Sequence, residues 1–89
     1  MTPDQKIQLE REVDYANMGK QVLNNEAYKR ALTARKAQIF DVFVNTKQEQ
    51  EDVRQEAWRT MQNLNALEDY FRIVLETGKM AETSLKSIK

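Results

Sequence analysis

Residues that favour turns are scarce in this chain, which has two glycines and one proline among 89 residues. An all-β or loop-rich fold needs frequent turns, and glycine and proline are the usual residues there. Hydrophobic residues make up 40% of the chain and charged residues 31%, which is ordinary for a soluble helical protein. We therefore expect an all-α fold, organised as a single helical domain over residues 1–89.

Two residue types that carry much enzyme chemistry are missing from the sequence. There is no cysteine, which excludes disulfides, thiolate nucleophiles and zinc sites of the cysteine type. There is no histidine, which removes the usual general base and a common metal ligand. Gly19 and Gly78 stand alone, so the sequence has no glycine-rich phosphate loop. We expect a protein that is not an enzyme and that has no catalytic, metal-binding or cofactor-binding residues.

The charges of the chain balance, because 14 basic side chains accompany 14 acidic ones. A balanced chain has no net field that would attract nucleic acid or an anionic membrane. No apolar run approaches the roughly 20 residues that a membrane span needs. The opening MTPDQKIQLE also lacks the apolar core of a secretory signal. We expect a protein that is not secreted and has no membrane partner.

The beginning of the chain predicts a helix over about residues 3–23. Thr2 is a suitable cap, Pro3 suits the first helical position, and Gln5 completes a capping box. The apolar residues of this helix form two groups on different sides, which suits contacts with two neighbours. The first group is Leu9, Val13, Ala16 and Leu23, and the second group is Ile7, Tyr15, Met18 and Val22.

Two further helices are predicted over about residues 25–45 and 47–77. Asn24 or Asn25 is a suitable cap for the first of them. Thr46 opens a second capping-box pattern, TKQE, which would begin the other helix. A single helix that runs unbroken through this threonine is the alternative.

Gly78 is placed to end the third predicted helix in a left-handed conformation. Residues 79–89 would then form a short helix or a flexible tail. Met18, Met61 and Met80 are expected to fill gaps in the core, since methionine adapts its shape to irregular spaces.

The short connection near residues 45–48 would make the second and third helices antiparallel neighbours. In that alignment Ile39 lies near Val53, so the apolar stripes of the two helices meet. The same alignment places Glu68 near Lys29. We expect an antiparallel helical hairpin with the N-terminal helix as a third element, in a three-helix bundle or an intertwined oligomeric bundle.

Five residues are candidates for a protein interface, namely Arg35, Trp58, Glu68, Tyr70 and Ile73. Arg35 and Glu68 interrupt apolar stripes, and a buried charge is costly unless it is paired. They are either partly exposed residues at the edge of a small core or charges that pair across an interface. Trp58, Tyr70 and Ile73 give the third helix a second apolar side. Either the first helix or a second subunit would cover that side.

Four basic residues lie close together in the second predicted helix, at Lys29, Arg30, Arg35 and Lys36. At about 100° per residue they spread over more than half of the helix circumference. A nucleic-acid surface would gather them in one stripe, with aromatic side chains for stacking. We therefore favour a role in helix solubility, with weak phosphate contacts by Lys29, Arg30 and Lys36 as the alternative.

Several short stretches of the chain resemble a group of viral proteins. They are NEAYKRA at residues 25–31, Trp58 followed by Leu64, Leu67 and Phe71, and LETGKMA at residues 75–81. With them, residues 24–81 resemble small helical proteins encoded among the virion-assembly and DNA-packaging genes of tailed bacteriophages. The resemblance implies a phage structural or accessory protein. Since no membrane span or secretory signal is expected, its location would be the host cytoplasm or the virion. It carries over no catalytic residue, and residues 1–23 lie outside it.

Three functions remain open on the sequence. The favoured one is a non-enzymatic helical assembly or adaptor protein, which would bind itself or a larger phage or host protein. Another is a phage inhibitor that covers a host enzyme. The remaining one is a nucleic-acid-binding accessory, such as a ring similar to a terminase small subunit, with contacts from Lys29, Arg30, Lys36, Lys79, Lys86 and Lys89.

Overall fold

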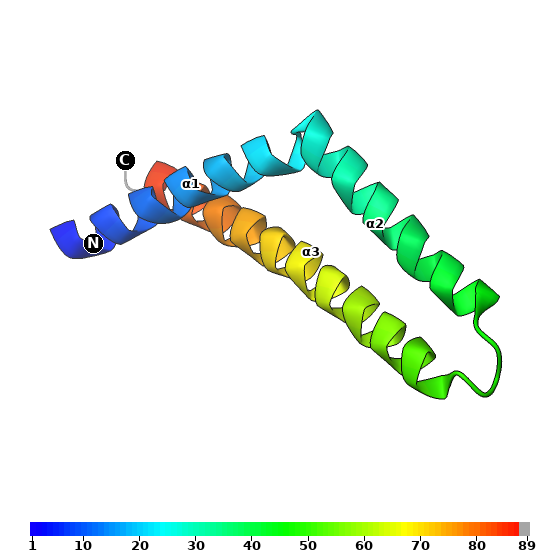
Figure 1. Cartoon of the computed structure of the whole chain (residues 1–89). Coiled ribbons are helices and arrows are strands. Elements are labelled where there is room, and N and C mark those ends of the chain that lie inside the picture. Colours follow the sequence, from blue (N-terminus) through cyan, green and yellow to red (C-terminus); the bar gives the residue numbers. More distant parts are fainter. Residues whose placement is uncertain (88–89) are drawn as a thin grey trace. The chain divides into compact units, whose positions relative to one another are not determined.

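The computed structural model describes residues 1–87, which form three α-helices and no strand (Figure 1). The helices are α1 (Pro3–Leu23), α2 (Glu26–Asn45) and α3 (Glu51–Lys86). The predicted all-α class is therefore confirmed. Ile88 and Lys89, the end of the predicted tail, lie outside the described residues.

The starts of α1 and α2 follow the capping residues that the sequence predicted. The Thr2 hydroxyl accepts a hydrogen bond from the Gln5 amide at 3.1 Å, and the Gln5 side chain accepts one from the Thr2 amide at 2.9 Å. These two bonds form the predicted capping box. For α2 the cap is Asn25, whose side-chain oxygen accepts from the Tyr28 amide at 3.0 Å. In both helices the cap satisfies an amide that the first turn leaves without a backbone partner.

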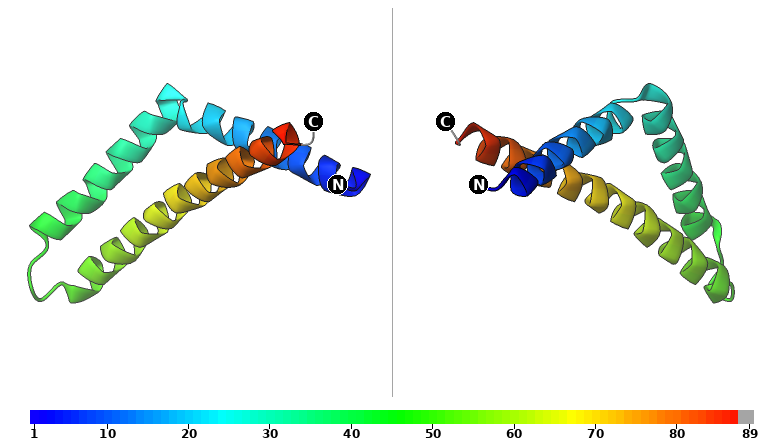
Figure 2. Two further views of the ribbon diagram at one scale, coloured as in Figure 1. Left: turned by 180° about the vertical axis from the view of Figure 1, so that it is seen from behind. Right: turned by 90° about the vertical axis from the view of Figure 1, so that its left-hand side faces the viewer.

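The connection between α2 and α3 differs from the prediction. Thr46 ends α2 and does not cap α3: its amide donates to the Val42 carbonyl at 3.0 Å, and its hydroxyl donates to the Phe43 carbonyl at 3.1 Å. The chain then turns, with the Lys47 amide donating to the Gln50 side chain at 3.0 Å. The predicted start of the third helix at residue 47 is therefore wrong. The alternative of one unbroken helix is also wrong (Figure 2).

The end of α3 also differs from the prediction. The helix continues through Gly78 to Lys86, and neither glycine adopts a positive φ. The predicted end at residue 77 is therefore wrong, and residues 79–86 form the last turns of α3. The physical reason is a helix contact: a Cβ atom built on Gly78 would overlap the Cβ of Ala16 and lie 3.1 Å from the Glu12 carbonyl oxygen. Gly78 permits close packing and does not end the helix.

The chain divides into two compact units. The first unit contains α1 and the part of α3 from Asp69 onward. Its buried residues are small or β-branched, namely Ala16, Gly19, Val74, Gly78 and Ala81. These residues let the two helices of this unit approach closely, as small residues at helix contacts do in general.

The second unit, Asn25–Glu68, contains α2 and the first part of α3. Ile39 and Ala57 are its buried apolar residues. The ammonium group of Lys36 forms an ion pair with Oε1 of Glu68. The predicted antiparallel register of the two helices placed Glu68 near Lys29. This was wrong, because the ion pair lies two helical turns further along α2. Both side chains are about one third exposed, so the pair contributes modestly to stability.

Across residues 1–87, no helix is long and apolar enough to cross a membrane.

Candidate protein interface

The apolar side chains of the structure are divided unevenly between its interior and its surface. In the described chain, the buried apolar residues are Ala16, Ile39, Ala57, Val74 and Ala81. The larger side chains are mostly at the surface, with Trp58 exposed by 57%, Phe40 by 61% and Met80 by 71%. Each unit therefore has few fully buried apolar residues and a surplus of large apolar groups at its surface. Surplus of this kind marks interaction surfaces when the side chains are contiguous.

The two apolar groups of α1 have different environments. Ala16 of the first group is buried, and the other three members are half-buried. The members of the second group, Ile7, Tyr15, Met18 and Val22, are exposed by 39–59%. The first group thus faces α3 within the first unit, and the second group lies largely at the surface. The expectation that Met18 fills a core gap is therefore wrong.

The second apolar side of α3 is also exposed. Tyr70 and Ile73 are exposed by 52% and 53%, so α1 does not cover them. Met80 follows at the same helical phase and was also wrongly expected in the core. Sequence spacing could have shown that Met80 shares this side of α3. Tyr70, Ile73, Thr77 and Met80 follow one another at intervals of three, four and three residues.

The hydroxyls of Tyr15 and Tyr70 join these two exposed stripes, because they lie 3.3 Å apart in a hydrogen bond. This bond, then the charge of an ionised Tyr70, and then partial desolvation raise the pKa of Tyr15 above its ordinary value of 10.0. The bond brings the two stripes together at these two residues. We call the two stripes together the tyrosine face, and it consists of Ile7, Tyr15, Met18, Val22, Tyr70, Ile73 and Met80.

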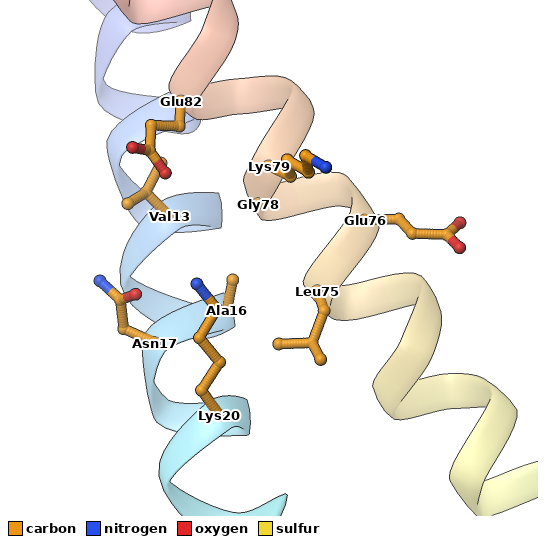
Figure 3. Close-up of a pocket in the computed structure, with 9 residues that line it drawn as sticks. All are labelled: Val13, Ala16, Asn17, Lys20, Leu75, Glu76, Gly78, Lys79 and Glu82. Carbon is orange, nitrogen blue, oxygen red and sulfur yellow. The ribbon is translucent and has the colours of Figure 1, made fainter.

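A hollow of about 360 Å³ lies between α1 and α3 of the first unit (Figure 3). It is lined by the apolar residues Val13, Ala16, Leu75 and Gly78 and by the polar residues Asn17, Lys20, Glu76, Lys79 and Glu82. Lys86 and, more weakly, Lys20 hold the pKa of the Glu82 carboxyl below its usual value of 4.5. At about 100° per residue, Lys20 and Glu82 lie roughly opposite the exposed apolar stripes of their helices, whereas Glu76 lies beside Met80.

The second unit has a smaller apolar surface. Phe40, Val44 and Trp58, which we call the tryptophan patch, are exposed by 57–62%. By helical phase they lie opposite a hollow that contains Arg35 and Glu56. With three members, this patch presents less apolar area than the tyrosine face.

The two charged interface candidates, Arg35 and Glu68, both interact with other residues of the second unit. Arg35 is exposed and donates a hydrogen bond to Gln38 at 3.4 Å. Glu68 is paired with Lys36 of the same chain. Within the second unit, both are therefore at least partly exposed charges with a polar neighbour.

The candidate nucleic-acid residues do not form one cationic surface. Arg30 lies 3.2 Å from the Glu26 carboxylate on the exposed surface of α2, and Lys36 is paired with Glu68. Lys29 is exposed. Two of the three cations therefore have a carboxylate neighbour that opposes phosphate binding.

No family model matches the chain, and comparison with curated proteins and with solved structures likewise found no match.

Proposed function

We propose that the chain is a non-enzymatic assembly protein that acts through protein–protein contacts, with a second copy of itself as the first partner. The observation that supports this proposal is the exposure of many large apolar side chains beside a core of few buried residues. Burying one large apolar side chain contributes about 1.5–3 kcal/mol. A small domain with a thin core has little stability of its own, so association would add much to it.

The residue types on the exposed surfaces also favour protein contacts. Tyrosine, tryptophan and methionine are enriched at protein interfaces relative to the rest of the surface. Tryptophan and tyrosine are also enriched among the residues whose truncation weakens binding strongly. Trp58 and Tyr70 are the aromatic anchors that we propose for such contacts.

The setting that we propose is virion assembly in a phage-infected cell, with the protein in the host cytoplasm or in the virion. Its support is the resemblance of residues 24–81 to small phage proteins. In this setting, the predicted hairpin of α2 with α3 and the N-terminal helix α1 would each contribute to a shared oligomeric bundle. A larger phage or host protein is the further partner of an adaptor of this type.

Light scattering over a wide range of concentrations tests this proposal. We expect a mass of at least twice the 10.5 kDa of one chain. A mass of one chain at all concentrations would contradict self-association and would favour the inhibitor of a host enzyme. Nucleic-acid binding has less support than either, because Arg30 and Lys36 have carboxylate neighbours.

A further inference from the structure

We infer that Tyr15 and Tyr70 form an oxidative cross-linking site, at which a one-electron oxidant joins the two rings as dityrosine and ties α1 to the last part of α3. The inference goes beyond the proposed function, because it concerns a covalent modification within one chain and needs no partner. The oxidant that we name is a haem peroxidase supplied with hydrogen peroxide.

The two tyrosines meet at the atoms where oxidation begins. Their hydroxyl oxygens lie 3.3 Å apart, although 55 residues separate them in the sequence. A phenol that loses one electron and its proton becomes a phenoxyl radical, whose unpaired electron is shared between the oxygen and the ortho and para ring carbons. Since the side chain occupies the para carbon, two such radicals join mainly at their ortho carbons. These carbons are next to the ones that bear the hydroxyls, so the hydrogen bond brings the reacting edges of the rings together.

Both rings are accessible to an oxidant and free to turn. Tyr15 is 50% exposed and Tyr70 is 52% exposed. Exposed side chains change rotamer within picoseconds to nanoseconds, so the two ortho carbons can meet. The third tyrosine of the chain, Tyr28, is half-buried and belongs to the second unit. It therefore provides an internal comparison for the exposed pair.

The reaction balances with one hydrogen peroxide molecule for each cross-link. The peroxidase transfers one electron and one proton from each hydroxyl to hydrogen peroxide, which is reduced to two water molecules. The two radicals then form one carbon–carbon bond between their ortho carbons. Each of these carbons afterwards passes its proton to the oxygen of its own ring, which restores both aromatic rings and both hydroxyls. The chain as a whole loses two hydrogen atoms.

The hydrogen bond also favours coupling at this pair. A hydrogen atom can pass between two oxygens at this distance, so oxidation of either ring supplies the pair with a radical. The chain has no cysteine, whose thiol would otherwise reduce a phenoxyl radical. Groups that are held together react much faster than the same groups free in solution, with effective molarities of about 10⁵–10⁸ M in well-oriented cases. Coupling within one chain should therefore be faster than coupling between chains.

A bond between these rings would close the chain on itself across 55 residues. Cross-links stabilise a fold mainly by restricting the unfolded chain, and the effect grows with the length of the closed loop. This cross-link would act on α1, which approaches α3 closely where Ala16 meets Gly78. The modified first unit could therefore no longer release α1 from α3.

Mass spectrometry of the dilute chain after peroxidase treatment tests the inference. We expect a product with the mass of one chain less two hydrogens. Trypsin should then release a cross-linked pair of peptides, residues 12–20 with Tyr15 and residues 60–72 with Tyr70. Oxidation of methionine adds oxygen instead, so mass distinguishes the two reactions. Tyr15→Phe and Tyr70→Phe should each lower the yield of dityrosine by about tenfold or more, whereas Tyr28→Phe is the matched control and should leave the yield unchanged.

The melting temperature gives a second reading. We expect peroxidase treatment to raise Tm by about 10 °C or more in the unmodified chain, and not in Tyr15→Phe, which lacks the cross-link. Dityrosine that forms equally in Tyr15→Phe, or that joins two chains, would overturn the inference. Absence of dityrosine from the treated unmodified chain would also overturn it, as would a cross-linked chain whose Tm does not rise. None of these outcomes bears on association, so the proposed function stands or falls separately by light scattering.

Discussion

The hydroxyl groups of Tyr15 and Tyr70 lie 3.3 Å apart and link α1 to the last part of α3 across 55 residues of sequence. Both side chains are about half exposed, so the link lies at the surface of the first unit and not in its core. This position makes the pair a marker of the tyrosine face. It also gives the face a titratable group that responds to its neighbour.

We predict that the first unit loses stability when the pH rises above 10. The folded-state pKa of Tyr15 is raised above its ordinary value of 10.0, first by the hydrogen bond to Tyr70. A group whose pKa is raised on folding contributes stability that is complete below its unfolded pKa and is lost as the pH rises through its folded pKa. Thermal melting from pH 8 to pH 11 should show this loss, and Tyr15→Phe should reduce it.

The ultraviolet absorbance of ionised tyrosine provides the direct check. In Tyr70→Phe the pKa of Tyr15 should fall toward 10.0, since the hydrogen bond and the neighbouring charge are both removed. An unchanged titration of Tyr15 in this variant would show that the two hydroxyls do not interact in solution.

The two glycines are predicted to respond in opposite directions to alanine. At Gly78 an added Cβ would overlap the Cβ of Ala16, so Gly78→Ala should push α1 from α3 and destabilise by about 1–3 kcal/mol. At Gly19 the nearest atom to an added Cβ is Phe71 Cδ1 at 3.6 Å, which is an ordinary contact. Gly19→Ala should therefore stabilise by up to about 1 kcal/mol, the helix-propensity difference.

Thermal melting followed by circular dichroism compares these variants under identical conditions. Gly19→Ala serves as the control for Gly78→Ala, because both glycines lie inside helices and the change is the same. Equal stabilisation by both variants would contradict the close approach of Gly78 to Ala16.

The residues at the two ends of α2 are predicted to contribute differently to the stability of the fold. Asn25→Ala should destabilise by about 1 kcal/mol, the usual effect of a lost N-cap, because its side chain holds the Tyr28 amide. Thr46→Ala should have a smaller effect, since Thr46 caps no helix start and its hydroxyl bonds only the Phe43 carbonyl. Urea unfolding measures both changes. A larger loss at Thr46 than at Asn25 would indicate that Thr46 begins α3 after all.

The sequence was informative wherever a local pattern decided the structure. Thr2 and Asn25 begin helices because their side chains reach amides three residues away, and such contacts depend only on neighbours in sequence. The all-helical class follows similarly from the scarcity of turn residues. The two apolar groups of α1 were also readable, because helical periodicity fixes which residues share a side.

The sequence was misleading where a distant contact decided the structure. Gly78 has the sequence context of a helix end, but its actual neighbour is Ala16, 62 residues earlier. The TKQE pattern after Asn45 fits a helix start, yet Thr46 closes α2. Met80 was expected in the core because periodicity alone does not say which of two apolar sides another helix will cover.

Weak and non-specific binding to DNA is a further prediction. Neutral overall charge and the carboxylate neighbours of Arg30 and Lys36 leave few cations to release counterions. A titration of short duplex DNA at moderate salt should show no saturable binding. Sub-micromolar affinity with a steep dependence on salt would contradict a role through protein contacts alone.

The dependence of thermal unfolding on protein concentration tests most directly whether association supports this thin-cored fold. Unfolding that is coupled to dissociation has a Tm that rises with concentration. For a dimer of this length, a hundredfold increase should raise Tm by about 8 °C. We predict such a rise for the unmodified chain. A Tm that is constant over the hundredfold range would contradict the account.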